Sequence, residues 1–266
     1  MGNASSDTLR LTLVDDKEEA FRLLQEAEKH DFYIEECRDD SRNAAARKGL
    51  SYSVQRVTPE EKHYYQAHLD DVLKRLPLRL TRDLGEVRIV PLMPSADGGM
   101  PHTRPKSLLC FSNLKQLISD NTLTHELWHV HQRAYQEGWK RVFGEIGWTE
   151  WQGQLPVELE KVRRFNPDTI DSPLWIYQNT WVPVPVFRDV SSPKMRDVDI
   201  WFYRPSQGDR MKEIPAALGR YFPKLPSAAY EHPRELAAYL LADPYEYGDS
   251  PGFQDLSRVM MQFKSS

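Results

Sequence analysis

Residues 123–131 read Leu-Thr-His-Glu-Leu-Trp-His-Val-His, and this stretch decides both the expected fold and the expected chemistry. It contains the pattern H-E-x-x-H, in which His125 and His129 are four residues apart. On an α-helix such residues lie one turn apart on the same face, so both imidazoles can bind one metal ion. Glu126 follows His125 about 100° around the helix, where it can take a proton from a metal-bound water. The stretch therefore predicts a helix that carries two metal ligands and a general base.

A catalytic zinc ion takes three protein ligands and keeps a fourth position open. The longer pattern H-E-x-x-H-x-x-G-x-x-H is not followed, because Gln132 stands at its glycine and Tyr135 at its third histidine. His131 lies about 240° around the helix from His125. We therefore expect His131 to point away from the metal, either toward solvent or as a supporting residue.

A carboxylate further along the chain is then the expected third ligand. Glu235 is the leading candidate because it lies early in a predicted helix, 231–241, with Pro233 in its first turn. Ala237 and Ala238 are small and would let that helix approach the H-E-x-x-H helix closely. The alternatives are Glu145, Glu150, Glu231 or no third ligand of this kind.

The remaining pattern predicts an α+β chain, mostly helical, with a small mixed sheet beside the H-E-x-x-H helix and long ordered loops. Helices are expected over 17–30, from a Thr58 cap to about Leu76, and over 120–137, where Gly138 would end the helix. Strands are expected over 87–90 and 107–111, with turns over 95–105 between them. Residues 139–227 hold most of the prolines and six of the seven tryptophans, so we expect them to be irregular but ordered.

Composition is that of a globular protein. The 266 residues are 40% hydrophobic and 28% charged, with a net charge of −4, which argues against a nucleic-acid-binding role. We expect one domain over 1–266, with a flexible segment 1–16, a helical part 17–84 and a metal-site core 85–242. The apolar run 181–187 is far shorter than the roughly twenty residues that span a bilayer, so no transmembrane segment is expected.

The cysteines and the first residues bear on localisation. Cys37 and Cys110 are expected to be free thiols in a reducing, cytoplasmic compartment. The chain opens Met-Gly-Asn-Ala-Ser-Ser, which makes Gly2 a candidate for myristoylation and hence for a weak membrane tether.

The H-E-x-x-H helix and a later His232-Pro233-x-Glu235-x-x-Ala238 together resemble the gluzincin branch of zinc metallopeptidases. Within that branch the chain is most similar to poorly characterised intracellular zincin-like proteins. Thr103-Arg104 and Asn166-Pro167-Asp168 add to a resemblance that covers roughly residues 85–242. It implies one zinc ion per chain, bound by His125, His129 and Glu235, with Glu126 as general base. The chain departs from related sequences at Ala237-Ala238-Tyr239, where an acidic residue is common, so no carboxylate partner for a ligand histidine is assigned.

The resemblance implies a zinc-dependent peptidase that acts on a peptide or protein. Zinc would lower the pKa of its bound water toward ~7, and Glu126 would remove a proton as this water attacks a carbonyl carbon. The candidates for stabilising the oxyanion are Arg104, Tyr203, Tyr230 and His232. The strand expected over 107–111 would pair with an extended substrate, as in zincin folds. The alternatives are a zincin-shaped binding module without peptidase activity and a zinc hydrolase of a non-peptide amide.

Overall fold

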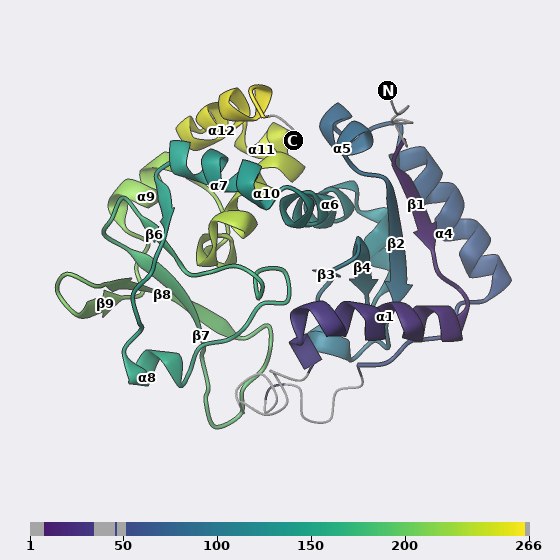
Figure 1. The fold of residues 1–266 in the computed structure, drawn as a ribbon, viewed down its shortest axis with the longest axis horizontal. Coiled ribbons are helices and arrows are strands. Elements are labelled where there is room, and N and C mark those ends of the chain that lie inside the picture. Colours follow the sequence, from purple (N-terminus) through teal and green to yellow (C-terminus); the bar gives the residue numbers. More distant parts are fainter. Residues whose placement is uncertain (1–7, 35–45, 47–51, 264–266) are drawn as a thin grey trace. The chain divides into compact units, whose positions relative to one another are not determined.

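The computed structural model describes residues 8–34, 46 and 52–263. The chain combines helices with small sheets, which confirms the expected α+β class (Figure 1). It divides into two compact units: unit 1 comprises residues 1–32 and 49–134, and unit 2 comprises residues 33–48 and 135–266. The expected single domain stays a prediction.

Unit 1 is built on a four-stranded sheet with the strand order β1-β2-β4-β3. The strands are β1 (Arg10–Leu13), β2 (Glu86–Pro91), β3 (His102–Arg104) and β4 (Leu108–Phe111). β1, β2 and β4 are parallel, whereas β3 runs antiparallel to β4, so the sheet is mixed. Because β4 has a neighbour on each side, its backbone cannot pair with a substrate. The role expected for 107–111 in substrate pairing is therefore wrong.

Helices complete unit 1. They are α1 (Lys17–Asp31), α4 (Pro59–Val72), α5 (Leu78–Asp83) and α6 (Asp120–Ala134), with short 3-10 turns η1 (Ala96–Gly99) and η2 (Leu114–Ile118). Ala20, Leu24 and Ala27 of α1 share a buried cluster with Leu108 and Cys110 of β4. α6 contacts both β3 and β4, which places the H-E-x-x-H motif beside the sheet, as expected.

Three local expectations for unit 1 need correction. Residues 10–13 were expected to be flexible but form β1, because Leu11 and Leu13 alternate into the core. The helix that begins after Thr58 ends at Val72 and does not reach Leu76. The turn-rich stretch 95–105 contains β3, whose three residues are all buried.

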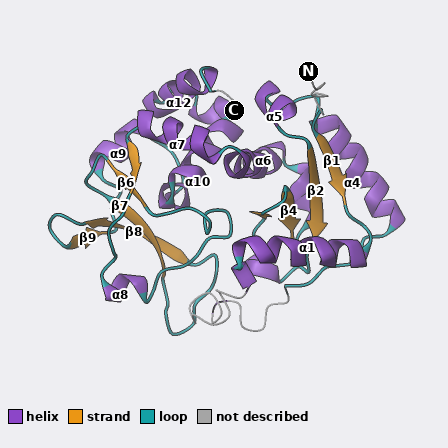
Figure 2. Cartoon of the chain, in the orientation of Figure 1, coloured by secondary structure: helices purple, strands orange, loops and turns teal. Residues whose placement is uncertain are grey.

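Unit 2 contains two small antiparallel sheets (Figure 2). β5 (Trp148–Glu150) pairs with β6 (Trp175–Tyr177), and β7 (Val182–Phe187), β8 (Val198–Arg204) and β9 (Asp209–Met211) form the other in that order. Residues 139–227 are thus ordered, but they are more regular than expected. The prolines of the run V-P-V-P-V led to the expectation of irregular structure. Proline is nevertheless tolerated in an edge strand, and β7 lies at the edge of its sheet.

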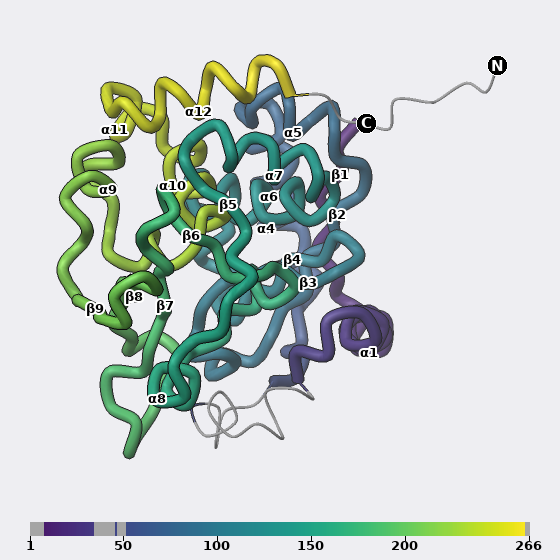
Figure 3. Tube along the Cα trace, turned by 60° about the vertical axis from the view of Figure 1, so that its left-hand side comes forward, coloured from purple at the N-terminus to yellow at the C-terminus, as the bar shows by residue number. Residues whose placement is uncertain are grey.

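The helices of unit 2 are α7 (Gln136–Glu145), α8 (Val157–Glu160), α9 (Ala216–Tyr221), α10 (Pro233–Ala242), α11 (Pro244–Tyr247) and α12 (Pro251–Met261), with the 3-10 turn η3 (Ser227–Glu231). α12 contacts α7 and α10 (Figure 3). Gly138 does not end a helix, because α6 stops at Ala134 and α7 includes Gly138. A Cβ at Gly138 would lie 2.6 Å from the ring of Phe263, so this glycine permits close packing within the unit.

Candidate metal site

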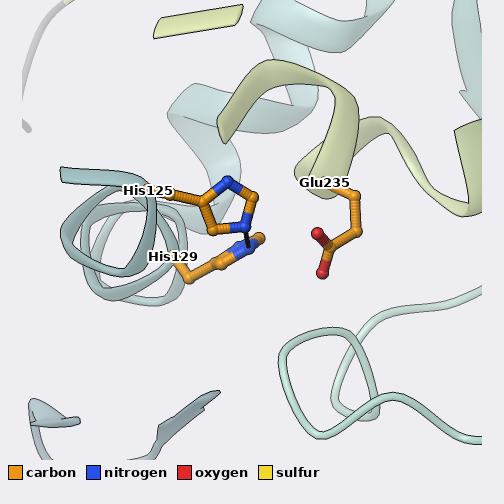
Figure 4. A group of neighbouring side chains, drawn as sticks. All are labelled: His125, His129 and Glu235. Carbon is orange, nitrogen blue, oxygen red and sulfur yellow. Dashed lines mark hydrogen bonds between the residues drawn. The ribbon is translucent and has the colours of Figure 1, made fainter. Parts of the chain in front are cut away.

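Helix α6 carries both motif histidines on one face, as the four-residue spacing predicts. The Nε2 atoms of His125 and His129 lie 3.0 Å apart, and the rings meet edge to face (Figure 4). Two nitrogen ligands of a tetrahedral zinc ion are separated by roughly 3.3 Å. The two imidazoles therefore present their nitrogens at a spacing that suits one metal ion.

Gln132 supports the second histidine. Its side-chain oxygen lies 2.8 Å from Nδ1 of His129, and both residues are fully buried. When Nδ1 donates its proton to this oxygen, Nε2 keeps a lone pair for a metal. No partner was assigned to a candidate ligand histidine from the sequence, and the structure shows that His129 has one in the amide of Gln132, three residues along the same helix.

Helix α10 presents Glu235 in its first turn. Nδ1 of His232 caps this helix by accepting a hydrogen bond from the backbone N–H of Arg234 (3.0 Å), and Pro233 occupies the first helical position. The positive end of the helix dipole stabilises a carboxylate in this turn. Glu235 is 6% exposed, and the side-chain amide of Asn166 donates to its Oε1 at 2.8 Å.

One ligand atom from each of His125, His129 and Glu235 lies within 4.8 Å of the other two. Figure 4 shows both imidazoles and the carboxylate turned toward a common point. Two imidazoles and a carboxylate make up the donor set of many catalytic zinc sites, which leave a fourth position open. The residues present therefore fit a zinc ion.

Glu126 lies on α6 next to His125 and is 4% exposed. The role of general base expected for Glu126 stays a prediction.

The three alternative third ligands are not grouped with the two histidines and make other contacts in unit 2. Glu150 forms an ion pair with Lys140 at 2.7 Å. Glu145 lines a separate cavity of about 530 Å³, together with Tyr177 and Tyr221. Glu231 accepts from Nη2 of Arg164 at 2.6 Å, and burial raises the pKa of Glu231 to about 7 although Arg164 lowers it. Among the described residues, the carboxylate grouped with the two histidines is that of Glu235.

Three of the four oxyanion candidates have their polar atoms engaged elsewhere. The buried guanidinium of Arg104 donates to both oxygens of Asp31 and to Glu28. Tyr230 donates its hydroxyl to the carbonyl of Phe222. His232 caps α10, and its Nε2 lies 3.4 Å from the carbonyl of Pro173.

Tyr203 is the remaining oxyanion candidate. It lies on β8, with its ring edge-on to Trp151 at a centroid distance of 6.1 Å. Its hydroxyl has no hydrogen-bond partner among the described residues. Tyr203 is therefore the candidate whose donor is not already in use.

His131 is not on a solvent-facing side. It is fully buried, its Nε2 lies 3.3 Å from Oδ2 of Asp83, and burial lowers its pKa to about 4. It packs edge to face against Trp128. The imidazole is thus a neutral part of the core of unit 1, where it contacts Asp83 at the end of α5.

The contacts of Gln132 with His129 and of Asn166 with Glu235 were not predicted from the sequence. Gln132 was cited only because it replaces the glycine of the longer motif. Its position three residues after His129, however, places it on the same side of the helix. Asn166 was cited only as part of the family resemblance. No local sequence pattern connects it to Glu235, which lies 69 positions later. Cys110 is a buried free thiol, as expected, whereas Gly2 and Cys37 lie outside the described residues.

Comparison with known proteins finds no protein family, no curated protein and no solved structure that matches this chain. In the part of the chain that the structure describes, no helix combines the length and the apolar character needed to cross a membrane.

Proposed function

We propose that this chain is a zinc-dependent peptidase of zincin-like fold, with one zinc ion bound by His125, His129 and Glu235. The observation that carries the proposal is the grouping of these three ligand atoms within 4.8 Å, with both histidines on a helix whose H-E-x-x-H spacing already predicts a metal site. A zinc ion in such a site makes water more acidic and polarises a carbonyl group.

The residues of the chain supply the remaining steps. Glu126 accepts a proton from the attacking water and returns it to the leaving amine, the usual work of a carboxylate base. Gln132 keeps His129 in the tautomer that binds a metal through Nε2. Tyr203 is the candidate donor to the oxygen on which negative charge develops.

Metal analysis and cleavage of a mixed peptide library test this function together. About one zinc ion per chain with peptide cleavage is the expected result. A chain that holds zinc but cleaves nothing would instead be a binding module. A chain that holds zinc and hydrolyses only non-peptide amides would be a zinc amidohydrolase and not a peptidase.

Replacing Glu126 tests the mechanism. Glu126→Gln keeps the size of the side chain but removes the base, so we expect full zinc content and a turnover reduced by roughly a hundredfold or more. The matched control is Glu137→Gln, the same change at an exposed position of α7, which should retain native turnover. Native turnover in Glu126→Gln would rule out this mechanism.

A further inference from the structure

Asn166 lies between two buried carboxylates of unit 2. Its Nδ2 donates to Oε1 of Glu235 at 2.8 Å and also to Oε1 of Glu231. These glutamates are 6% and 4% exposed, at the start of α10 and the end of η3. An amide nitrogen has two hydrogens, so Asn166 can serve both carboxylates at once.

The orientation of this amide follows from its third contact. Oδ1 of Asn166 accepts a hydrogen bond from the backbone N–H of Asp168 at 3.1 Å. The oxygen therefore faces the turn at 166–168, and the donating nitrogen faces the carboxylates.

The segment that carries Asn166 is itself anchored. The backbone N–H of Arg164 donates to the carbonyl of Pro185 in β7 at 2.8 Å, at the edge where the prolines supply no N–H. Nη2 of Arg164 donates to Oε2 of Glu231 at 2.6 Å. Arg164 thus donates to one carboxylate oxygen of Glu231 and Asn166 to the other. The ion pair with Arg164 fixes the carboxylate of Glu231, which in turn helps to fix the amide of Asn166.

We propose that Asn166 is a positioning residue that holds the carboxylate of Glu235 ready for metal binding. The inference rests on the proposed zinc site. A glutamate side chain loses rotamer freedom when it is fixed, and a hydrogen bond that orders it beforehand reduces this entropic cost when metal binds. One such bond uses only part of the acceptor capacity of a carboxylate, so Glu235 can still coordinate an ion.

The decisive variant is Asn166→Asp. Aspartate has nearly the same size and keeps an oxygen for the N–H of Asp168, but it replaces the donor with a negatively charged acceptor. Losing a group that orients a metal ligand typically costs 10- to 100-fold in metal affinity. We therefore expect the zinc dissociation constant to rise by roughly 10- to 100-fold, measured by competition with a chromophoric chelator.

The matched control is Asn179→Asp. Asn179 is an exposed residue of unit 2 with a left-handed backbone, which aspartate also tolerates. This variant adds the same charge to the same unit and should bind zinc as the native chain does.

Two further measurements separate positioning from folding. Asn166→Ala removes the donor without adding a charge, and we expect a smaller loss of zinc affinity than in Asn166→Asp. Thermal unfolding in excess chelator reports the stability of the metal-free chain. Two quantities are compared between each Asn166 variant and the native chain: the melting temperature without metal, and the increase in melting temperature when zinc is added. A positioning role predicts that the variants lose more of the second quantity than of the first.

Zinc binding as tight as native, or tighter, in both Asn166 variants would overturn the positioning role. Absence of zinc from the native chain would instead overturn the proposed function, so the two failures are distinguishable.

Discussion

The three histidines of the motif helix have different surroundings although they lie within seven residues. His125 is partly exposed, His129 is buried against Gln132, and His131 is buried against Asp83. Their spacing along the helix separates the first two from the third, because 240° of rotation carries His131 to another face. What that face contacts depends on α5, which contacts α6.

The burial of His131 predicts a pH dependence of stability. Its folded-state pKa of about 4 lies below the ordinary value of 6.5, so the unfolded chain takes up a proton first as the pH falls. Stability is therefore retained above pH 6.5 and decreases as the pH falls toward 4. From this residue alone we expect a loss of roughly 2 kcal/mol between pH 7.5 and pH 5, measured by urea unfolding with a chelator present.

His131→Gln is the variant for this test, because glutamine can donate to Asp83 but does not titrate. Its stability should decrease less than that of the native chain over the same pH interval. His63→Gln, a change at an exposed position of α4, is the control and should follow the native curve. Equal pH dependence in all three proteins would contradict the assignment.

At the scale of elements, local signals determine where helices begin. The capping box predicted at the start of α4 is present: Thr58 accepts from the N–H of Glu61, and Glu61 accepts from the N–H of Thr58. Helix ends follow the packing instead. α6 and α7 are separated at Tyr135, and Gly138 serves contact with Phe263.

Thr58→Ala tests the energetic value of the capping box. Thr58 is exposed, so the substitution removes the cap without opening a cavity. We expect the free energy of unfolding to fall by about 1 kcal/mol in chemical denaturation. Thr58→Ser keeps the capping oxygen and should stay within a few tenths of a kcal/mol of the native value. A Thr58→Ala protein as stable as the native one would show that the first turn of α4 contributes nothing measurable.

At the scale of the whole molecule, the proposed zinc ligands come from distant parts of the chain. His129 and Glu235 are 106 positions apart in the sequence. An ion that binds only the folded chain stabilises it in proportion to its affinity and free concentration. Zinc bound by all three ligands should therefore raise the stability of the whole chain.

Glu235→Ala tests this arrangement. Two histidines alone hold zinc far less firmly than three ligands, so the variant should lose zinc on dialysis and show no increase in melting temperature when zinc is added. Glu150→Ala removes a carboxylate that pairs with Lys140 and should retain both zinc and the increase. The reverse pattern would mean that the third ligand lies close to the H-E-x-x-H motif in sequence.

The sequence alone determined what depends on neighbours within one or two turns. The shared face of His125 and His129 on α6 and the cap of α4 follow from residues three or four positions apart, where helix geometry specifies the distance. The cap of α10 follows from residues only two positions apart. The tertiary structure alone decided that Asn166 contacts Glu235, that β4 lies inside its sheet, and that His131 is buried. Those features depend on which segments pack together, and burial by distant segments leaves no periodic signal in the local sequence.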